Sequence, residues 1–352
     1  MAEKYSRESI KDLAFALLTK GGLPDDKAEV VAELLTRTDE LGVTTHGLSM
    51  VPYYLPELAS GKMTTSGTHE VVSDRGATMV WDGNYLPGHW LMTQALDLCM
   101  ERARTHGVAC LAMRRSHHIG CLSTLTRIAA EAGFVCMINT SDPSGAWVAP
   151  FGGTTPVLTP NPWAVGYPAA DHPVLIDTCA SITTVSKVRE YVNSKRQFDH
   201  PWMLDGAGNP TTDPNVVNQT PKGSILPVGG SDHGHKGFAM ALTVEMLSQA
   251  LSGHGRSESV TRWGGNVFLQ VMDPEAFAGL DAFTTEVDAL NTACRSNPPA
   301  PGVRHVRIPG DRAAEMLTRS RTEGISLPDE VWTRVTEAAG VLGVRLPRPI
   351  SG

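Results

Sequence analysis

The stretch VACLAMRRSHHIGCLSTLTRIAAEAGFVCMIN, residues 108–139, decides the fold class. Residues 108–113 form a β-rich run, and residues 134–139 form a second one. Between these runs, apolar residues recur at helical spacing from Leu122 onward, so a helix is expected after a polar loop. The order strand, helix, strand predicts a mixed α/β unit.

The loop inside this stretch carries Ser-His-His-Ile-Gly at residues 116–120. A Rossmann unit carries G-x-G-x-x-G between its first strand and helix, because the backbone must approach a pyrophosphate closely there. No such string occurs in the chain. The motif evidence therefore disfavours a Rossmann domain.

Further elements are expected on both sides of this stretch. The additional β-rich runs cover residues 71–72, 78–81, 163–167, 267–272 and 303–308. Helical spacing predicts one helix capped by Ser6, a second after Pro24, a third over residues 236–251, and two amphipathic helices that close the chain.

Two structural units are expected from the length of 352 residues, since single cores stop growing near about 250–300 residues. We assign residues 1–72 plus 311–352 to a helical domain and residues 73–310 to a mixed α/β domain. Residues 192–223, rich in Pro, Gly and Asn, are predicted to be a long irregular excursion, and loops of that length are usually functional.

Composition narrows the function classes. A net charge of −7 without a basic run argues against nucleic acid as a partner. No stretch approaches the roughly 20 apolar residues of a membrane span, so we expect no membrane partner and a cytoplasmic protein. The six cysteines are scattered and are expected to be reduced. His233 and His235 lack a placed third ligand, so no metal is expected.

Several polar segments, taken in order along the chain, resemble the malate/L-lactate dehydrogenase type 2 family. The matching segments are residues 42–47, 52, 116–120, 149–153, 161–162, 177, 208–214, 235–238 and 309–312. The resemblance implies a non-Rossmann α/β fold, in which a mixed-sheet cofactor-binding domain lies beside a helical domain. It also implies a homodimer that uses NAD or NADP on a small-molecule substrate.

The resemblance assigns the catalytic residues. His46 matches the family's proton-donor histidine, and an imidazole with an ordinary pKa of about 6.5 can give up a proton near neutrality. Thr45 supplies a hydroxyl that can orient this ring, whereas Thr44 replaces the usual aspartate. His118 matches a second histidine that serves as acid or base in some members. The alternatives are a histidine bonded at a helix–loop junction for His46 and a surface loop histidine for His118.

The resemblance also implies the cofactor-contacting residues. They are His118, Ile119, Gly120, Cys121, Leu122, Asp177, Thr178, Cys179, Lys236, Gly310, Asp311 and Arg312. Free amides at the helix start after His118 can meet a phosphate, and the cations suit a pyrophosphate or a 2′-phosphate. A turn-capping role for Asp177 and a solvated lysine at position 236 are the alternatives.

Two positions that concern the substrate differ from the family pattern. The family's carboxylate-binding arginine falls on Met50, and the threonine before the Asn161-Pro162 pair falls on Pro160. Met50 and Asn161 are the expected substrate contacts. Either another cation, such as Arg114 or Arg115, binds the carboxylate, or the substrate presents an apolar or amide group.

The sequence therefore predicts a reductase of a small 2-oxo acid, a related ketone or a cyclic imine acid, with His46 as proton donor. A protein of the same shape that binds or regulates without catalysis is the alternative, motivated by Met50 and Pro160.

Overall fold

A seven-stranded mixed sheet forms the centre of the computed structural model, which describes residues 3–350. Its strands, in spatial order, are β1 (Glu70–Asp74), β2 (Thr78–Asp82), β3 (Val108–Ser116), β10 (Gly265–Met272), β4 (Val135–Ser141), β5 (Pro162–Tyr167) and β6 (Val174–Cys179). Only the β2–β3 pair of this sheet is parallel among the described strands. The predicted non-Rossmann α/β fold with a mixed sheet is confirmed.

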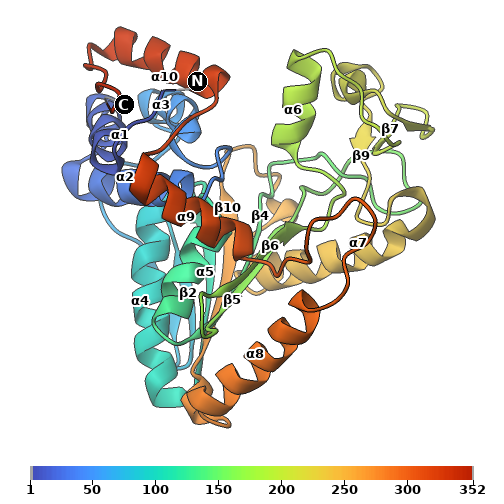
Figure 1. The fold of residues 1–352 in the computed structure, drawn as a ribbon. Helices are drawn as coiled ribbons and strands as arrows, with labels where there is room; N and C mark the ends of the chain where they lie inside the picture. The colour runs from blue at the N-terminus through green and yellow to red at the C-terminus, as the bar shows by residue number, and fades with distance from the viewer. Residues whose placement is uncertain (1–2, 351–352) are drawn as a thin grey trace.

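Two helices pack against this sheet and build its core. Helix α4 (Gly88–His106) packs on β3 and β10, and α5 (Leu122–Glu131) packs on β4, β5 and β6 (Figure 1). The apolar spacing predicted from Leu122 onward is the buried face of α5, where Leu125 and Ala129 lie inside the sheet core. The fold therefore places the loop of residues 117–121 at the end of β3, directly before α5.

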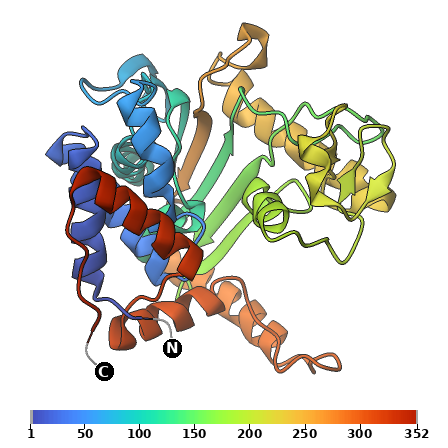
Figure 2. The same ribbon diagram turned by 90° about the horizontal axis from the view of Figure 1, so that it is seen from above.

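Helices from both ends of the chain form a second apolar core. They are α1 (Arg7–Lys20), α2 (Asp25–Glu40), α3 (Val51–Ala59) and α10 (Asp329–Leu342). Ser6 caps α1 as predicted, because its hydroxyl accepts a hydrogen bond from the Ser9 amide at 3.1 Å. Two backbone bonds join Tyr5 to Ile325, of 2.9 and 2.8 Å, so the first and last elements lie together (Figure 2).

Most of residues 192–223 lie outside helices and strands, in keeping with the predicted irregular excursion, although the segment carries short regular elements. It contains strands β7 (Met203–Leu204) and β8 (Pro210–Thr211) and a 3₁₀ turn (Pro214–Asn218), and β9 (Ser224–Ile225) completes a three-stranded sheet. Helix α6 (Val185–Asn193) precedes it. Buried aromatic and aliphatic side chains give this part its own apolar cluster. The division into a helical domain (residues 1–72 plus 311–352) and a sheet domain (residues 73–310) stays a prediction.

The remaining helices differ from expectation in places. Helix α7 (Gly230–Glu245) begins before the predicted residue 236 and continues as a π-helical turn (Met246–Ala250). Helix α9 (Asp311–Glu323) and α10 are the two predicted closing helices. Helices α3, α4, α6 and α8 (Leu280–Arg295) are not predicted by the sequence patterns.

The predicted strand at residues 303–308 is wrong. This segment links α8 to α9 and is mostly exposed, with Val303 at 50%. It reaches the sheet edge through one backbone bond, from the Leu175 amide to the Pro309 carbonyl, at 3.0 Å. A flanking proline cannot donate to a strand ladder, so pairing does not continue there.

Candidate active site

Two predicted histidines meet at the junction of the helical core and the sheet. His46 lies on the turn after α2, and His118 lies on the loop between β3 and α5. Their rings are stacked, with centroids 5.7 Å apart and planes inclined by 23°. Distant segments thus bring two imidazoles together, and an imidazole within hydrogen-bond reach of a bound substrate can serve as a general acid or base.

The ring of His46 is held by its neighbour. Thr45 Oγ1 lies 2.8 Å from Nδ1 of His46, so a hydroxyl engages this ring as predicted. Because Nδ1 is occupied, Nε2 is the nitrogen left to exchange a proton with a substrate. Burial lowers the pKa of His46, and the nearby carboxylate of Asp177 opposes this shift. The imidazole is therefore mainly neutral at neutral pH.

His118 is surrounded by aromatic side chains. Its Nδ1 lies 2.7 Å from the hydroxyl oxygen of Tyr54, and its ring centroid lies 5.5 Å from that of Trp263. Burial, followed by the neighbouring histidines His46 and His89, lowers the pKa of His118 well below its usual value. His118 is thus a neutral, oriented ring rather than a surface loop histidine.

Two further histidines support this pair from the protein interior. His117 is fully buried and its Nε2 lies 3.5 Å from a Glu57 carboxylate oxygen, while His89 is 3% exposed. Burial lowers the pKa of each imidazole to about 3. His117 therefore points into the interior, which resolves which of the adjacent histidines stacks on His46. Sequence patterns gave no signal for His89, Tyr54 or Trp263, because isolated aromatic residues carry no spacing.

Asp177 makes the capping contact that was the alternative to its predicted role in cofactor binding. Its carboxylate accepts a hydrogen bond from the Ser123 amide at 2.8 Å, so it caps the N-terminus of α5, where a negative charge is favourable. The same carboxylate is close enough to influence the pKa of His46. Thr178 beside it is exposed, and Cys179 Sγ lies 3.3 Å from the Ser181 carbonyl oxygen.

The loop from His118 to α5 is shaped by close packing. Ile119, Cys121 and Leu122 are all at most 5% exposed. Gly120 has a φ of +78°, and a Cβ there would lie 2.2 Å from Nε2 of His89. Only glycine fits this position, so the interior histidine and the loop determine each other's place.

The other predicted cofactor residues lie on separate elements. Lys236 is exposed on α7 and makes no hydrogen bond or ion pair within residues 3–350. Gly310, with φ of +108°, packs against the start of β6, the strand that carries Asp177. Asp311 is bound by the Arg295 guanidinium at 2.5 Å, and Arg312 is exposed.

The two predicted substrate residues lie in the interior. Met50 is 8% exposed within the helical core. Asn161 is fully buried, and its amide nitrogen donates to the Ala241 carbonyl at 3.0 Å and to Glu245 at 2.9 Å. The amide of Asn161 is thus engaged in joining β5 to α7.

The two arginines considered as replacements for the family arginine share one buried partner. Arg114 Nε donates to Asp82 at 2.8 Å, and Arg115 Nε donates to the same carboxylate at 2.9 Å. Asp82 is fully buried, so both cations compensate its charge. Among residues 3–350, no group of three or more His, Cys, Asp and Glu side chains is arranged to hold a metal, and no helix is long and apolar enough to cross a membrane.

Solved structures of dehydrogenases and a reductase share this fold. Malate dehydrogenase from Entamoeba histolytica matches with a TM-score of 0.91 and 25% identity, over 99% of this chain and 100% of that chain. Delta1-piperideine-2-carboxylate reductase from Pseudomonas syringae matches with a TM-score of 0.81 and 28% identity, over 96% and 100%. With the paired histidines, these matches define the class of protein as an oxidoreductase.

The family follows from the sequence comparisons. The family model described as malate/L-lactate dehydrogenase matches residues 5–336. L-lactate dehydrogenase from Cupriavidus necator is 32% identical over 351 residues, which is 98% of this chain and 99% of that protein. The chain belongs to the malate/L-lactate dehydrogenase family, and the resemblance drawn from the ordered motifs is confirmed.

Proposed function

We propose that this family member is an NAD(P)-dependent reductase of a small 2-oxo acid, a related ketone or a cyclic imine acid, with His46 as the proton donor. The observation that carries the proposal is the stack of His46 on His118, with Thr45 and Tyr54 holding one nitrogen of each ring. The relatives named for lactate and for piperideine-2-carboxylate support this range of substrates.

Exposed polar groups on the predicted cofactor segments are the ones that would hold a dinucleotide. Thr178 and the uncapped part of the α5 N-terminus can bind ribose and phosphate oxygens, and Lys236 is a cation without a partner among the described residues. Asp177 already accepts the Ser123 amide, so one helix amide is not available to a phosphate. A bound dihydronicotinamide supplies the hydride.

The chain's own residues manage the proton. Hydride addition to a carbonyl or imine carbon leaves negative charge on oxygen or an electron pair on nitrogen, and protonated His46 delivers a proton there from Nε2. In the reverse direction, neutral His46 accepts the hydroxyl proton of a 2-hydroxy acid. The lowered pKa of His46 favours the neutral, accepting form. Thr45 keeps the ring oriented through both steps.

The test compares two matched variants, His46→Gln and His118→Gln. Dinucleotide binding is measured by fluorescence quenching, and turnover is measured on pyruvate, oxaloacetate and a cyclic imine acid. His46→Gln should lower turnover by about 10²–10⁴, the usual contribution of general acid catalysis, and leave dinucleotide affinity nearly unchanged. If His118→Gln does this and His46→Gln does not, the proton donor is His118. Dinucleotide binding without turnover on any substrate would instead favour the non-catalytic alternative.

The same proposal includes a homodimer that works in the cytoplasm without a metal. Sedimentation of the purified chain gives its mass in solution and so tests whether it is a dimer. Retention of activity in the presence of a chelator tests the absence of a metal, and loss of activity that zinc restores would contradict it.

A further inference from the structure

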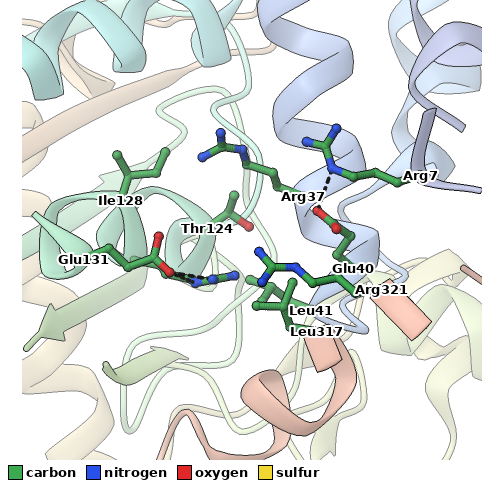
Figure 3. A pocket seen from close by; sticks show the side chains of 10 residues that line it. Arg7, Arg37, Glu40, Leu41, Thr124, Ile128, Glu131, Leu317 and Arg321 are labelled. Atoms are coloured by element: carbon green, nitrogen blue, oxygen red, sulfur yellow. Dashed lines mark hydrogen bonds and ion pairs between the residues drawn. The ribbon is translucent and has the colours of Figure 1, made fainter. Parts of the chain in front are cut away.

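A cavity of about 170 Å³ lies outside the histidine site, between helices α1, α2, α5 and α9. Six charged side chains line it, namely Arg7, Arg37, Arg127, Arg321, Glu40 and Glu131 (Figure 3). Its volume is far above the about 10–15 Å³ that one ordered water needs, so it has room for a small ligand of several heavy atoms.

The charges around this cavity leave a small positive excess. Its four arginines face the two glutamates of the lining and Glu33 beside it, which pairs with Arg7 and with Arg37, so the formal excess is one positive charge. Glu40 is engaged by Arg7 Nε at 3.2 Å, and Glu131 by Arg127 at 2.5 Å. The side chain of Arg321 makes no hydrogen bond or ion pair within residues 3–350. It is exposed, so its guanidinium is open to an anion that enters the cavity from solvent.

The four arginines come from four different helices and line one cavity. Figure 3 shows Arg37 and Arg321 extending into the space in front of Thr124 and Ile128. Arg37 uses its Nε atom to bind Glu33 at 2.7 Å, which leaves its terminal nitrogens for another acceptor. Planar guanidinium groups match the oxygens of carboxylates and phosphates in a bidentate way.

We propose that this cavity binds a compact oxyanion, such as inorganic phosphate or a four-carbon dicarboxylate. The positive excess of the lining favours an anion over a neutral ligand. The volume admits either ligand, and Arg37 and Arg321 supply the free donors.

The cavity lies beside the two segments that carry the paired histidines. Leu41, at the end of α2, lines the cavity and lies five positions before His46, and α5 begins four positions after His118. A buried hydrogen bond of 2.9 Å between Thr38 and Thr124 already joins α2 to α5. An anion bound by Arg37 and Arg321 would join α2 to α9 next to this bond.

The experiment measures binding rather than turnover, so its outcome is independent of the proposed reaction. Isothermal titration of the full chain uses inorganic phosphate in one arm and succinate in the other, at ionic strength matched with chloride. One anion per chain should bind in at least one arm. The thermal midpoint should rise with its concentration, because a ligand that binds only the folded state stabilises it.

Two charge-matched variants on α9 locate the site. Arg321→Gln should raise the Kd at least about tenfold, the effect of losing one charge-assisted contact. Arg319→Gln removes the same charge two positions away, where its Nε binds Glu323 at 3.1 Å outside the cavity, and should change the Kd less than about twofold. Equal thermal midpoints of the two variants in chloride alone establish that both are folded.

The phosphate and succinate titrations also show which class of anion the cavity binds. Binding of phosphate alone indicates a phosphate or phosphoryl ligand, and binding of succinate alone indicates a dicarboxylate. Each result supports the site, provided that Arg321→Gln weakens it and saturating NADH does not displace the anion. Displacement by NADH would show that the cavity belongs to the dinucleotide site and would overturn the proposal. Absence of binding in both arms, or equal binding by Arg321→Gln, would also overturn it.

Discussion

Asp39 lies beneath the loop that carries His46, and its charge state controls part of the protein's stability. The side chain is 3% exposed, Oδ2 accepts a hydrogen bond from the Leu48 amide at 2.7 Å, and Oδ1 has no partner among the described residues. Gly47 packs so tightly on it that a Cβ would lie 1.9 Å from Oδ1. Burial raises the pKa of Asp39 to about 8, against which the single amide bond works only in part.

This raised pKa determines whether the free energy of unfolding rises or falls with pH. In the unfolded chain the carboxyl group titrates near pH 4, so between about pH 4 and 8 the folded state binds the extra proton. By linkage, the free energy of unfolding contributed by Asp39 is largest at low pH and falls as pH rises toward the folded pKa. The slope is about 1.4 kcal/mol per pH unit. Between pH 5 and 7, the loss amounts to about 3 kcal/mol.

The perturbation that tests this is Asp39→Asn, which keeps an acceptor for the Leu48 amide and removes the titration. Urea unfolding of both proteins at pH 5, 6 and 7 gives the difference in their free energies of unfolding. The variant should gain about 3 kcal/mol relative to wild type from pH 5 to pH 7. A buried amide without partners adds a constant offset, which does not alter this slope.

Asp199→Asn, an exposed carboxylate in the excursion, is the matched control and should show a difference that does not change with pH. A pH-independent difference for Asp39→Asn would refute the reasoning. So would a difference of opposite slope, in which the variant loses stability relative to wild type as pH rises.

Three further predictions concern the site. Thr45→Val should lower turnover about tenfold, because the lost hydroxyl bond orients Nδ1 of His46, and it should change stability little, because residue 45 is exposed. Unchanged turnover would exclude this orienting role. The kcat/KM of reduction should fall, and that of oxidation should rise, as pH increases through an apparent pKa below 6.5, because burial lowers the pKa of His46. The pH–rate profile of His46→Gln should lack this step. Asn161→Ala should lower the free energy of unfolding by about 2–5 kcal/mol, measured by denaturant titration, because it removes two buried hydrogen bonds, one to the Ala241 carbonyl and one to the Glu245 carboxylate. A selective rise in KM without loss of stability would instead support the predicted substrate contact.

The positions of several residues were predictable because their patterns are local. The strand–helix–strand order of residues 108–139 follows from apolar spacing, and the Ser6 cap follows from a side chain and an amide three residues apart. The ordered motifs likewise indicated the family before any geometry was known. The four helices that were not predicted show the limit of this approach. Only Asn291 of α8 is buried, so its spacing carries little signal of a core-facing side.

The partners of these elements depend on the tertiary structure. Strand β10 lies between β3 and β4, although β3 and β4 are neighbours along the chain, and residues 303–308 remain outside the sheet despite a β-rich composition. Spacing along the chain reports which side of an element is buried, but it does not report what covers that side.

The active site shows the same division between what local sequence patterns predict and what the tertiary structure determines. Sequence alone identified His46 and His118 as candidates and the type of chemistry they can perform. Only the tertiary structure stacked their rings, placed Tyr54 on His118, and engaged the Asn161 amide with α7. It also brought four arginines from four helices around one cavity. The reason is physical, because burial, pKa shifts and hydrogen-bond partners arise from groups that are distant in sequence and become neighbours only when the chain has folded.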